Sequence, residues 1–131
     1  MTTKDEVIAK SHEKCAVCGW GGHVTIIEVH HILPKASEGD DFTTNQIVLC
    51  PNHHTLVTAL IAGTLKVSDL GEMNPQLEAC KTLARACVYL RMIQAARNLG
   101  DDNTLHQVKL AMLHVQDRIE QIKLGITWRP H

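Results

Sequence analysis

Cysteine and histidine side chains, which are common zinc ligands, cluster in the first half of this chain of 131 residues. Cys15 and Cys18 are separated by two residues, and Cys50 and His53 repeat that spacing further along. Two thiolates at this spacing can hold one tetrahedral ion, and the second pair, at the start of a helix, would project to one side. The four residues therefore predict a Cys₃His structural zinc site. A redox-active pair is the alternative, but it expects a thioredoxin-like βαβ context, which the sequence lacks.

Two pairs of adjacent histidines, His30–His31 and His53–His54, could supply further chemistry. Adjacent side chains point to opposite faces of a strand and differ by about 100° around a helix. Each pair is therefore expected to divide between two roles. If His53 faces the zinc, His54 faces the segment that carries the other pair. An isolated pair of this kind could instead consist of surface histidines whose hydrogen bonds are satisfied and which have no catalytic or metal-binding role.

The motif pieces occur in a fixed order: Cys15-x2-Cys18, then Glu28-Val29-His30-His31-Ile32-Leu33-Pro34, then Asn45, then Val48-Leu49-Cys50-Pro51-Asn52-His53-His54. This order resembles the HNH endonucleases of the ββα-metal (His-Me finger) superfamily. The resemblance covers about residues 12–62 and implies an α+β fold: a small ββα-metal finger with a zinc knuckle. Residues 74–131 lie outside it, so their role is not inherited.

The resemblance also implies roles for individual residues. His31 matches the general base that takes a proton from the attacking water. His30 and His54 match the ligands of a catalytic divalent ion, and Asn45 matches a residue that orients the loop and the base. The implied activity is metal-dependent hydrolysis of DNA phosphodiester bonds, with double-stranded DNA as the partner. Imidazoles titrate near neutral pH and therefore suit general-base work.

Two positions depart from the usual family pattern. His53 stands where many relatives have a fourth cysteine, and histidine can replace cysteine in a structural zinc site. His30 stands where the family often has aspartate. The expected catalytic ion is Mn²⁺, Ni²⁺, Co²⁺ or Mg²⁺. Two neutral imidazoles hold Mg²⁺ less well than a carboxylate does and suit Mn²⁺, Co²⁺, Ni²⁺ or Zn²⁺ better, so higher activity is expected with Mn²⁺ or Ni²⁺ than with Mg²⁺.

The second half of the chain is predicted to be a helical hairpin. Asn74–Pro75 is a helix start, the helix runs to about Leu99, and Gly100 closes it before a new cap at 101–103. The next helix has apolar residues at alternating spacings of three and four: Leu105, Val108, Met112, Val115, Ile119 and Ile122. This seam could pack only against the partner helix or could form a dimer interface, and six positions do not separate the two. We expect an intramolecular hairpin that also forms a homodimer. The expected division is a nuclease module over residues 1–65 and a hairpin extension over residues 66–131.

The first half is predicted to contain two strands, at residues 24–29 and 47–49, with a loop at residues 34–44 between them. A helix follows from Pro51 through Leu60 and ends at Gly63. Residues 4–14 could add one or two helical turns. Cys80 and Cys87 lie seven residues apart on one helix face and are expected to be buried apolar residues.

Composition and charge restrict the function further. Aromatic residues make up only 3% of the chain, which disfavours a base-stacking platform for single strands. The N-terminus has no apolar signal core, and no apolar run approaches the roughly 20 residues that span a bilayer, so a cytoplasmic location is expected. Residues 1–73 carry five Lys and Arg against nine Asp and Glu, and residues 74–131 carry eight against five. Lys81 and Arg85, four residues apart, could contact phosphate or could only aid solubility.

Two other functions remain open at this point. The chain could be a zinc-stabilised DNA-binding or assembly module with an inactive nuclease centre, or it could be an RNA or structure-specific nuclease. The presence of His31, Asn45 and His54 together argues against an inactive centre.

Overall fold

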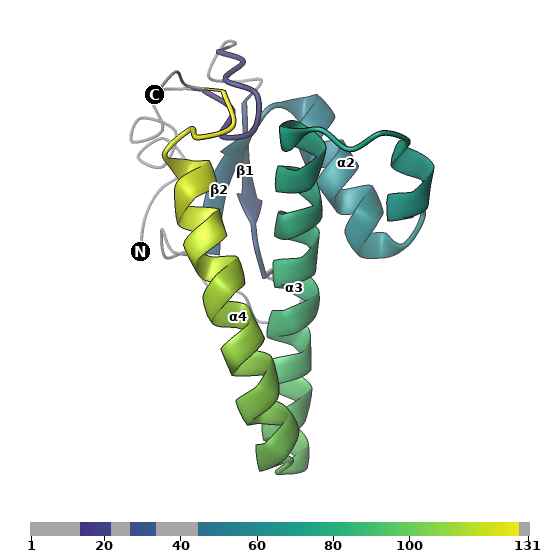
Figure 1. Cartoon of the computed structure of the whole chain (residues 1–131), viewed down its shortest axis with the longest axis vertical. Coiled ribbons are helices and arrows are strands. Elements are labelled where there is room, and N and C mark those ends of the chain that lie inside the picture. Colours follow the sequence, from purple (N-terminus) through teal and green to yellow (C-terminus); the bar gives the residue numbers. More distant parts are fainter. Residues whose placement is uncertain (1–13, 22–26, 34–44, 129–131) are drawn as a thin grey trace.

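The computed structural model describes residues 14–21, 27–33 and 45–128. The elements are β1 (Glu28–His31), β2 (Gln46–Leu49), α2 (Pro51–Ala62), the short 3-10 helix η3 (Val67–Leu70), α3 (Pro75–Leu99) and α4 (Asp102–Lys123). The two strands and α2 pack at one end of a long hairpin formed by α3 and α4 (Figure 1). This is the predicted α+β arrangement. Most of the residues of the predicted helical turns at 4–14, and the whole predicted loop at 34–44, lie outside the described residues.

The strand pair is antiparallel and places the two adjacent histidines on opposite faces. His30 pairs with Ile47, and His31 pairs with Gln46. Ile47 belongs to the main core, so His30 lies on the face that meets the helices. β1 begins at Glu28 and continues through His31, whereas the sequence predicted a strand over residues 24–29; residues 24–26 lie outside the described part. The strand therefore includes both histidines.

Helix α2 begins and ends where its local sequence predicts. Pro51 occupies the first turn, where its missing N–H removes no helical hydrogen bond. Gly63 follows the last turn in the left-handed conformation, with φ of 77°, and its N–H bonds back to the helix. The first turn of α2 therefore follows directly after β2 and Cys50. This short segment carries Cys50 and His53 of the predicted zinc site and His54 of the second histidine pair.

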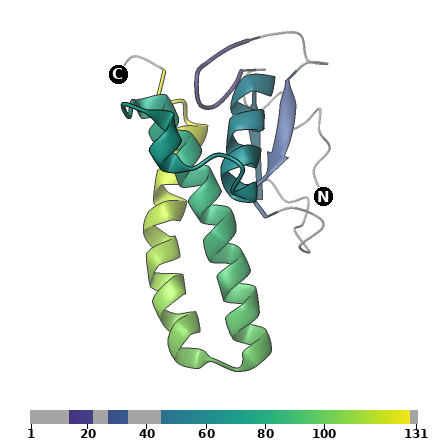
Figure 2. The same ribbon diagram turned by 90° about the vertical axis from the view of Figure 1, so that its right-hand side faces the viewer.

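Helices α3 and α4 form the predicted antiparallel hairpin, joined by a tight turn at the end far from the sheet (Figure 2). The Asn74 and Asp101 side chains accept hydrogen bonds from backbone N–H groups in the first turns of α3 and α4. Five of the six predicted seam residues are buried, and Leu105 packs partly buried against them. The buried residues of α3 are mostly small, four alanines and two cysteines beside one leucine and one isoleucine: Ala79, Cys80, Leu83, Ala84, Ala86, Cys87, Ile93 and Ala96. The seam is thus used within one chain, and both cysteines are buried as predicted.

The end of the chain returns to the residues around Cys15. The Thr127 hydroxyl donates to the carbonyl oxygen of Val17 at 2.6 Å, and the Trp128 indole donates to Ala16 at 3.1 Å. Gly19 lies directly against the Trp128 ring with φ of 76°, and a Cβ there would come within 2.5 Å of the ring. Only glycine fits this backbone and this close approach. The C-terminal segment is therefore packed onto the zinc-knuckle segment, residues 15–20.

One continuous core joins the two halves of the chain. It includes Cys15, Leu49 and Val57 from the first half and Leu83 and Ile119 from the hairpin. Within the described residues, no helix is both long and apolar enough to cross a membrane.

Candidate metal centres

The four predicted zinc ligands converge. One ligand atom from each of Cys15, Cys18, Cys50 and His53 lies within 4.8 Å of all the others. The Cys18 and Cys50 sulfurs are 3.9 Å apart, and His53 Nδ1 lies 3.2 Å from Cys50 Sγ and 3.9 Å from Cys15 Sγ. Zn–S bonds of about 2.3 Å in a tetrahedron place sulfur ligands about 3.8 Å apart. The cluster therefore has the dimensions of a structural zinc site.

Backbone hydrogen bonds hold the knuckle in place. The Cys15 N–H donates to the Trp20 carbonyl at 3.0 Å, and the Gly19 N–H donates to the Cys15 carbonyl at 2.9 Å. The Ala16 N–H donates to the carbonyl of Val48 in β2 at 2.9 Å. This last bond fixes the first cysteine pair beside the strand that leads into Cys50.

The electrostatics of the cluster favour a bound cation. Burial raises the pKa of Cys15, but hydrogen bonds from the His53 side chain and from backbone groups outweigh that effect and lower the pKa to about 6. Burial, together with the charges of Cys15 and Cys50, raises the pKa of Cys18 to about 12. Three crowded thiols thus cannot all ionise at neutral pH by themselves. A divalent ion removes this conflict because it binds the thiolate form.

A second group of side chains lies between β1 and α2. The rings of His30 and His54 are 5.3 Å apart between centroids and inclined at 69°. His30 is buried, and its Nε2 has no hydrogen-bond partner among the described residues. Burial and the neighbouring His54 and His31 lower the pKa of His30 to about 4, so the ring is neutral at pH 7. A buried nitrogen without a partner is unfavourable, and a metal ion beside it would supply one.

Glu28 orients the second of these rings. Its carboxylate forms an ion pair with Nδ1 of His54. A carboxylate that accepts from Nδ1–H directs the lone pair of Nε2 outward, which is how carboxylates support metal-binding histidines. The sequence reasoning gave Glu28 no role. Glu28 lies two residues before His30 and therefore on the same strand face, which could have indicated that its carboxylate lies near the histidines.

Hydrogen bonds near the end of β1 and the start of β2 involve His31 and Asn45. His31 Nε2 is 3.3 Å from Gln46 Nε2 on the paired strand. Asn45 makes two hydrogen bonds to Leu33: its Oδ1 accepts from the backbone N–H at 2.8 Å, and its Nδ2 donates to the carbonyl at 3.0 Å. Asn45 therefore connects the residues just after β1 to the start of β2.

An open hollow of about 530 Å³ joins the histidines. Its lining residues are Val29, His30, His31, His54, Thr58, Ile61, Ala62 and Arg91. Although His30 and His31 face opposite sides of the sheet, both reach this hollow. Arg91 comes from α3, and the sequence reasoning did not include it because only the packing of α3 against α2 brings it to the histidines.

Residues 15–59 match the family model described as HNH endonuclease. The matched span contains both strands, most of α2, the cysteine cluster and all four histidines of the two pairs. The resemblance to the HNH endonucleases is therefore confirmed for this segment, which is about a third of the chain. Comparison with curated proteins found no match, and comparison with solved structures found none either.

Adjacent substitutions in α2 should separate the two centres. His53→Ala should lose bound zinc and lower the melting temperature by about 10 °C or more, the shift that a loss of about 3 kcal/mol produces in a domain of this size. His54→Ala is the matched control and should retain both zinc and stability, because its ring faces β1. Metal analysis of the purified variants and thermal unfolding measure the two effects. Equal zinc content in both variants would contradict this assignment.

Proposed function

We propose that this chain is a metal-dependent endonuclease that hydrolyses phosphodiester bonds of double-stranded DNA. The family match supports a nuclease-type function. The observation that carries the proposal is the buried, neutral His30, whose Nε2 has no partner among the described residues and which lies beside His54 and the hollow shared with His31. A neutral, buried imidazole beside a second imidazole and open space is suited to hold an ion that remains accessible to phosphate.

In this proposal His30 and His54 hold a divalent ion, and Glu28 fixes the tautomer and direction of His54. When bound, the ion would stabilise negative charge on the scissile phosphate and on the leaving oxygen. Manganese, nickel and cobalt suit this donor set better than magnesium does. The cysteine cluster would hold a separate zinc ion that stabilises the fold and takes no part in the reaction.

His31 is the proposed general base. The Gln46 side chain engages Nε2 of His31 and sets the direction of the ring. With the Gln46 amide oriented so that its oxygen accepts from Nε2–H, Nδ1 carries the lone pair and is the nitrogen that we assign to the proton transfer. The water that loses this proton attacks phosphorus and the bond to the 3′ oxygen breaks. The departing 3′ oxygen takes a proton from solvent, so the products carry a 5′ phosphate and a 3′ hydroxyl, as the resemblance implies. Asn45 acts as a positioning residue because it holds the end of β1 that carries His31.

Homodimer formation through the C-terminal helices is a further part of the proposal. The seam of α4 is buried within the chain, so a partner would have to meet other residues. Leu110 and Leu113 on α4 are 46% and 60% exposed, which supports a contact on that face.

Replacement of the proposed base tests the reaction directly. His31→Ala should reduce metal-dependent nicking of supercoiled plasmid by about 10²–10⁴-fold, the usual contribution of a general base. His114→Ala, an exposed histidine on α4, should cleave like the unmodified chain. Full activity of the His31 variant would reject the mechanism. If the unmodified chain cleaves with none of the divalent ions, the inactive-centre alternative is correct.

The identity of the proposed catalytic ion gives a second test. Cleavage should be faster with Mn²⁺ or Ni²⁺ than with Mg²⁺, because both ligands are imidazoles and no carboxylate is assigned to the ion. Initial rates at equal ion concentration, with zinc kept in the cysteine cluster, measure this preference. Cleavage supported by Mg²⁺ alone would overturn the assignment of His30 and His54 as the complete protein ligand set.

The ion pair of Glu28 with His54 gives a third test. Glu28→Gln should weaken binding of the catalytic ion by about 10–100-fold, since it removes the charge that fixes the ligand ring. Zinc content should not change, because Glu28 does not belong to the cysteine cluster. Titration of Mn²⁺ against the cleavage rate, together with metal analysis, provides both readings. An unaltered Mn²⁺ requirement would show that Glu28 does not support the ion.

A further inference from the structure

Helix α3 carries an excess of positive charge that the proposed reaction does not use. Its sequence contains four cations, Lys81, Arg85, Arg91 and Arg97, against a single carboxylate, Glu78. Helix α4, of similar length, has three Lys and Arg against three Asp and Glu. The basic character of the second half of the chain is therefore concentrated on α3.

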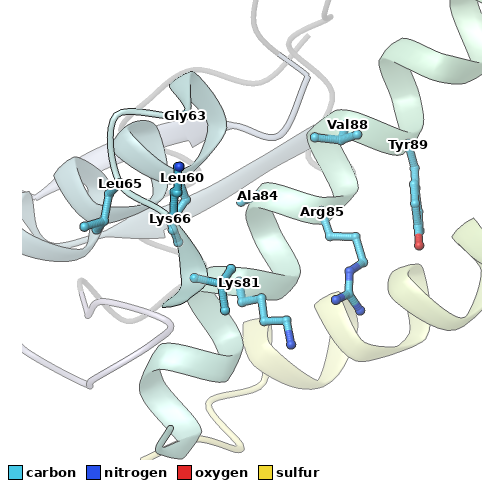
Figure 3. A pocket seen from close by; sticks show the side chains of 10 residues that line it. Leu60, Gly63, Leu65, Lys66, Lys81, Ala84, Arg85, Val88 and Tyr89 are labelled. Carbon is cyan, nitrogen blue, oxygen red and sulfur yellow. The ribbon is translucent and has the colours of Figure 1, made fainter. Parts of the chain in front are cut away.

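Two of these cations line a second hollow, of about 490 Å³, on the side of α3 next to the end of α2. Lys81 and Arg85 extend to the same side of α3, with Tyr89 one turn further along (Figure 3). Lys66, from the segment after α2, also belongs to the lining. The remaining lining residues are apolar or glycine: Leu60, Gly63, Leu65, Val67, Ala84 and Val88. The hollow therefore combines an apolar floor, which can carry aliphatic stems, with three cationic groups.

The cations of this region have no charge partners in the part of the chain that the structure describes. Within the described residues, none of Lys66, Lys81, Arg85 and Arg91 forms an ion pair. Glu78 precedes Lys81 by three residues but does not pair with it. Among the described residues, no carboxylate lines either hollow. Positive charge that none of these carboxylates neutralises is available to an external anion.

Arg91 connects this surface to the histidines. It is exposed, and among the described residues that line the histidine hollow it is the one Lys or Arg. Lys81 and Arg91 are separated by ten residues, which is about 15 Å along a helix. This length corresponds to about four base-pair steps of 3.4 Å. Arg91 lies about 120° around the helix from Arg85, so the three cations follow the surface of α3 around from one hollow to the other. We call Lys81, Arg85 and Arg91 together the cationic face of α3.

We infer that the cationic face of α3 binds the phosphate backbone of the DNA that flanks the cleavage site, with Arg91 nearest the histidines and Lys81 furthest from them. The inference rests on the proposed function for the position of that site. A backbone partner fits better than an acidic peptide, because the charges continue from the second hollow to the histidine hollow, where the phosphodiester would lie. Phosphate contacts from lysine, arginine and tyrosine position a duplex without reading its sequence.

The salt dependence of DNA binding tests the inference without requiring cleavage. The measurement uses the full chain carrying His31→Ala and a short DNA duplex. Arg91→Gln should reduce the slope of log K against log salt by about 0.9, and the double variant Lys81→Gln with Arg85→Gln by about twice that. Glutamine keeps much of each side-chain stem, so the change isolates the charge. Circular dichroism checks that the helices are retained.

Two matched controls are available on the same hairpin. Arg97→Gln on α3 and Lys109→Gln on α4 each remove an exposed cation that lines neither hollow. Both should leave affinity and salt slope close to those of the parent. Equal losses in the controls, or unchanged slopes in the variants of the cationic face, would overturn the inference. In the second case the face serves another partner, such as an acidic protein surface.

Cleavage assays on the same substitutions, in the chain that retains His31, distinguish this inference from the proposed function. Active cleavage together with unchanged binding slopes would reject the docking surface alone. Reduced slopes in a chain that cleaves no substrate would reject the nuclease function and retain the docking surface. If the unsubstituted chain shows neither salt-dependent DNA binding nor cleavage, both the docking surface and the nuclease function are rejected.

Discussion

The first turn of α2 is the constraint on which the rest of the molecule depends. His53 and His54 are adjacent, and neighbouring side chains on a helix diverge by about 100°. One ring therefore joins the cysteine cluster while the other turns toward β1. The direction of this single turn fixes both centres at once. Any rotation of α2 would move the two rings together, so a stable cysteine cluster also fixes the geometry of the histidines.

Three sets of contacts hold the segments around this turn in place. The Ala16 N–H ties the knuckle to β2, the hydrophobic core continues from Cys15 into the hairpin, and the C-terminal segment packs on the knuckle. A chain with few aromatic residues has small side chains in much of this core. The buried side chains of α3 are mostly alanine and cysteine, so the core around α3 gains stability from many small contacts rather than from a few large residues.

Local patterns in the sequence predicted the features that depend on neighbouring residues. The spacing of Cys15 and Cys18, the proline at the start of α2 and the caps at Asn74 and Asp101 all act within a few residues. The strand of the histidine pair was placed too early, because β-branched residues before Glu28 suggested a strand and the pairing with β2 was not visible. The ion pair of Glu28 with His54 and the approach of Arg91 were also missed. These contacts join residues that are 26 or more positions apart, so only the folded chain reveals them.

The contact of Trp128 with the knuckle has an optical consequence. The chain contains two tryptophans, and both belong to this region: Trp20 accepts a backbone hydrogen bond from Cys15, and the Trp128 indole covers Gly19 beside Lys14. The long hairpin of α3 and α4 contributes only Tyr89 to ultraviolet emission. Intrinsic fluorescence of this protein therefore originates almost entirely at one end of the molecule. A change in emission reports the environment of the knuckle, whereas unwinding at the far end of the hairpin leaves the spectrum unchanged.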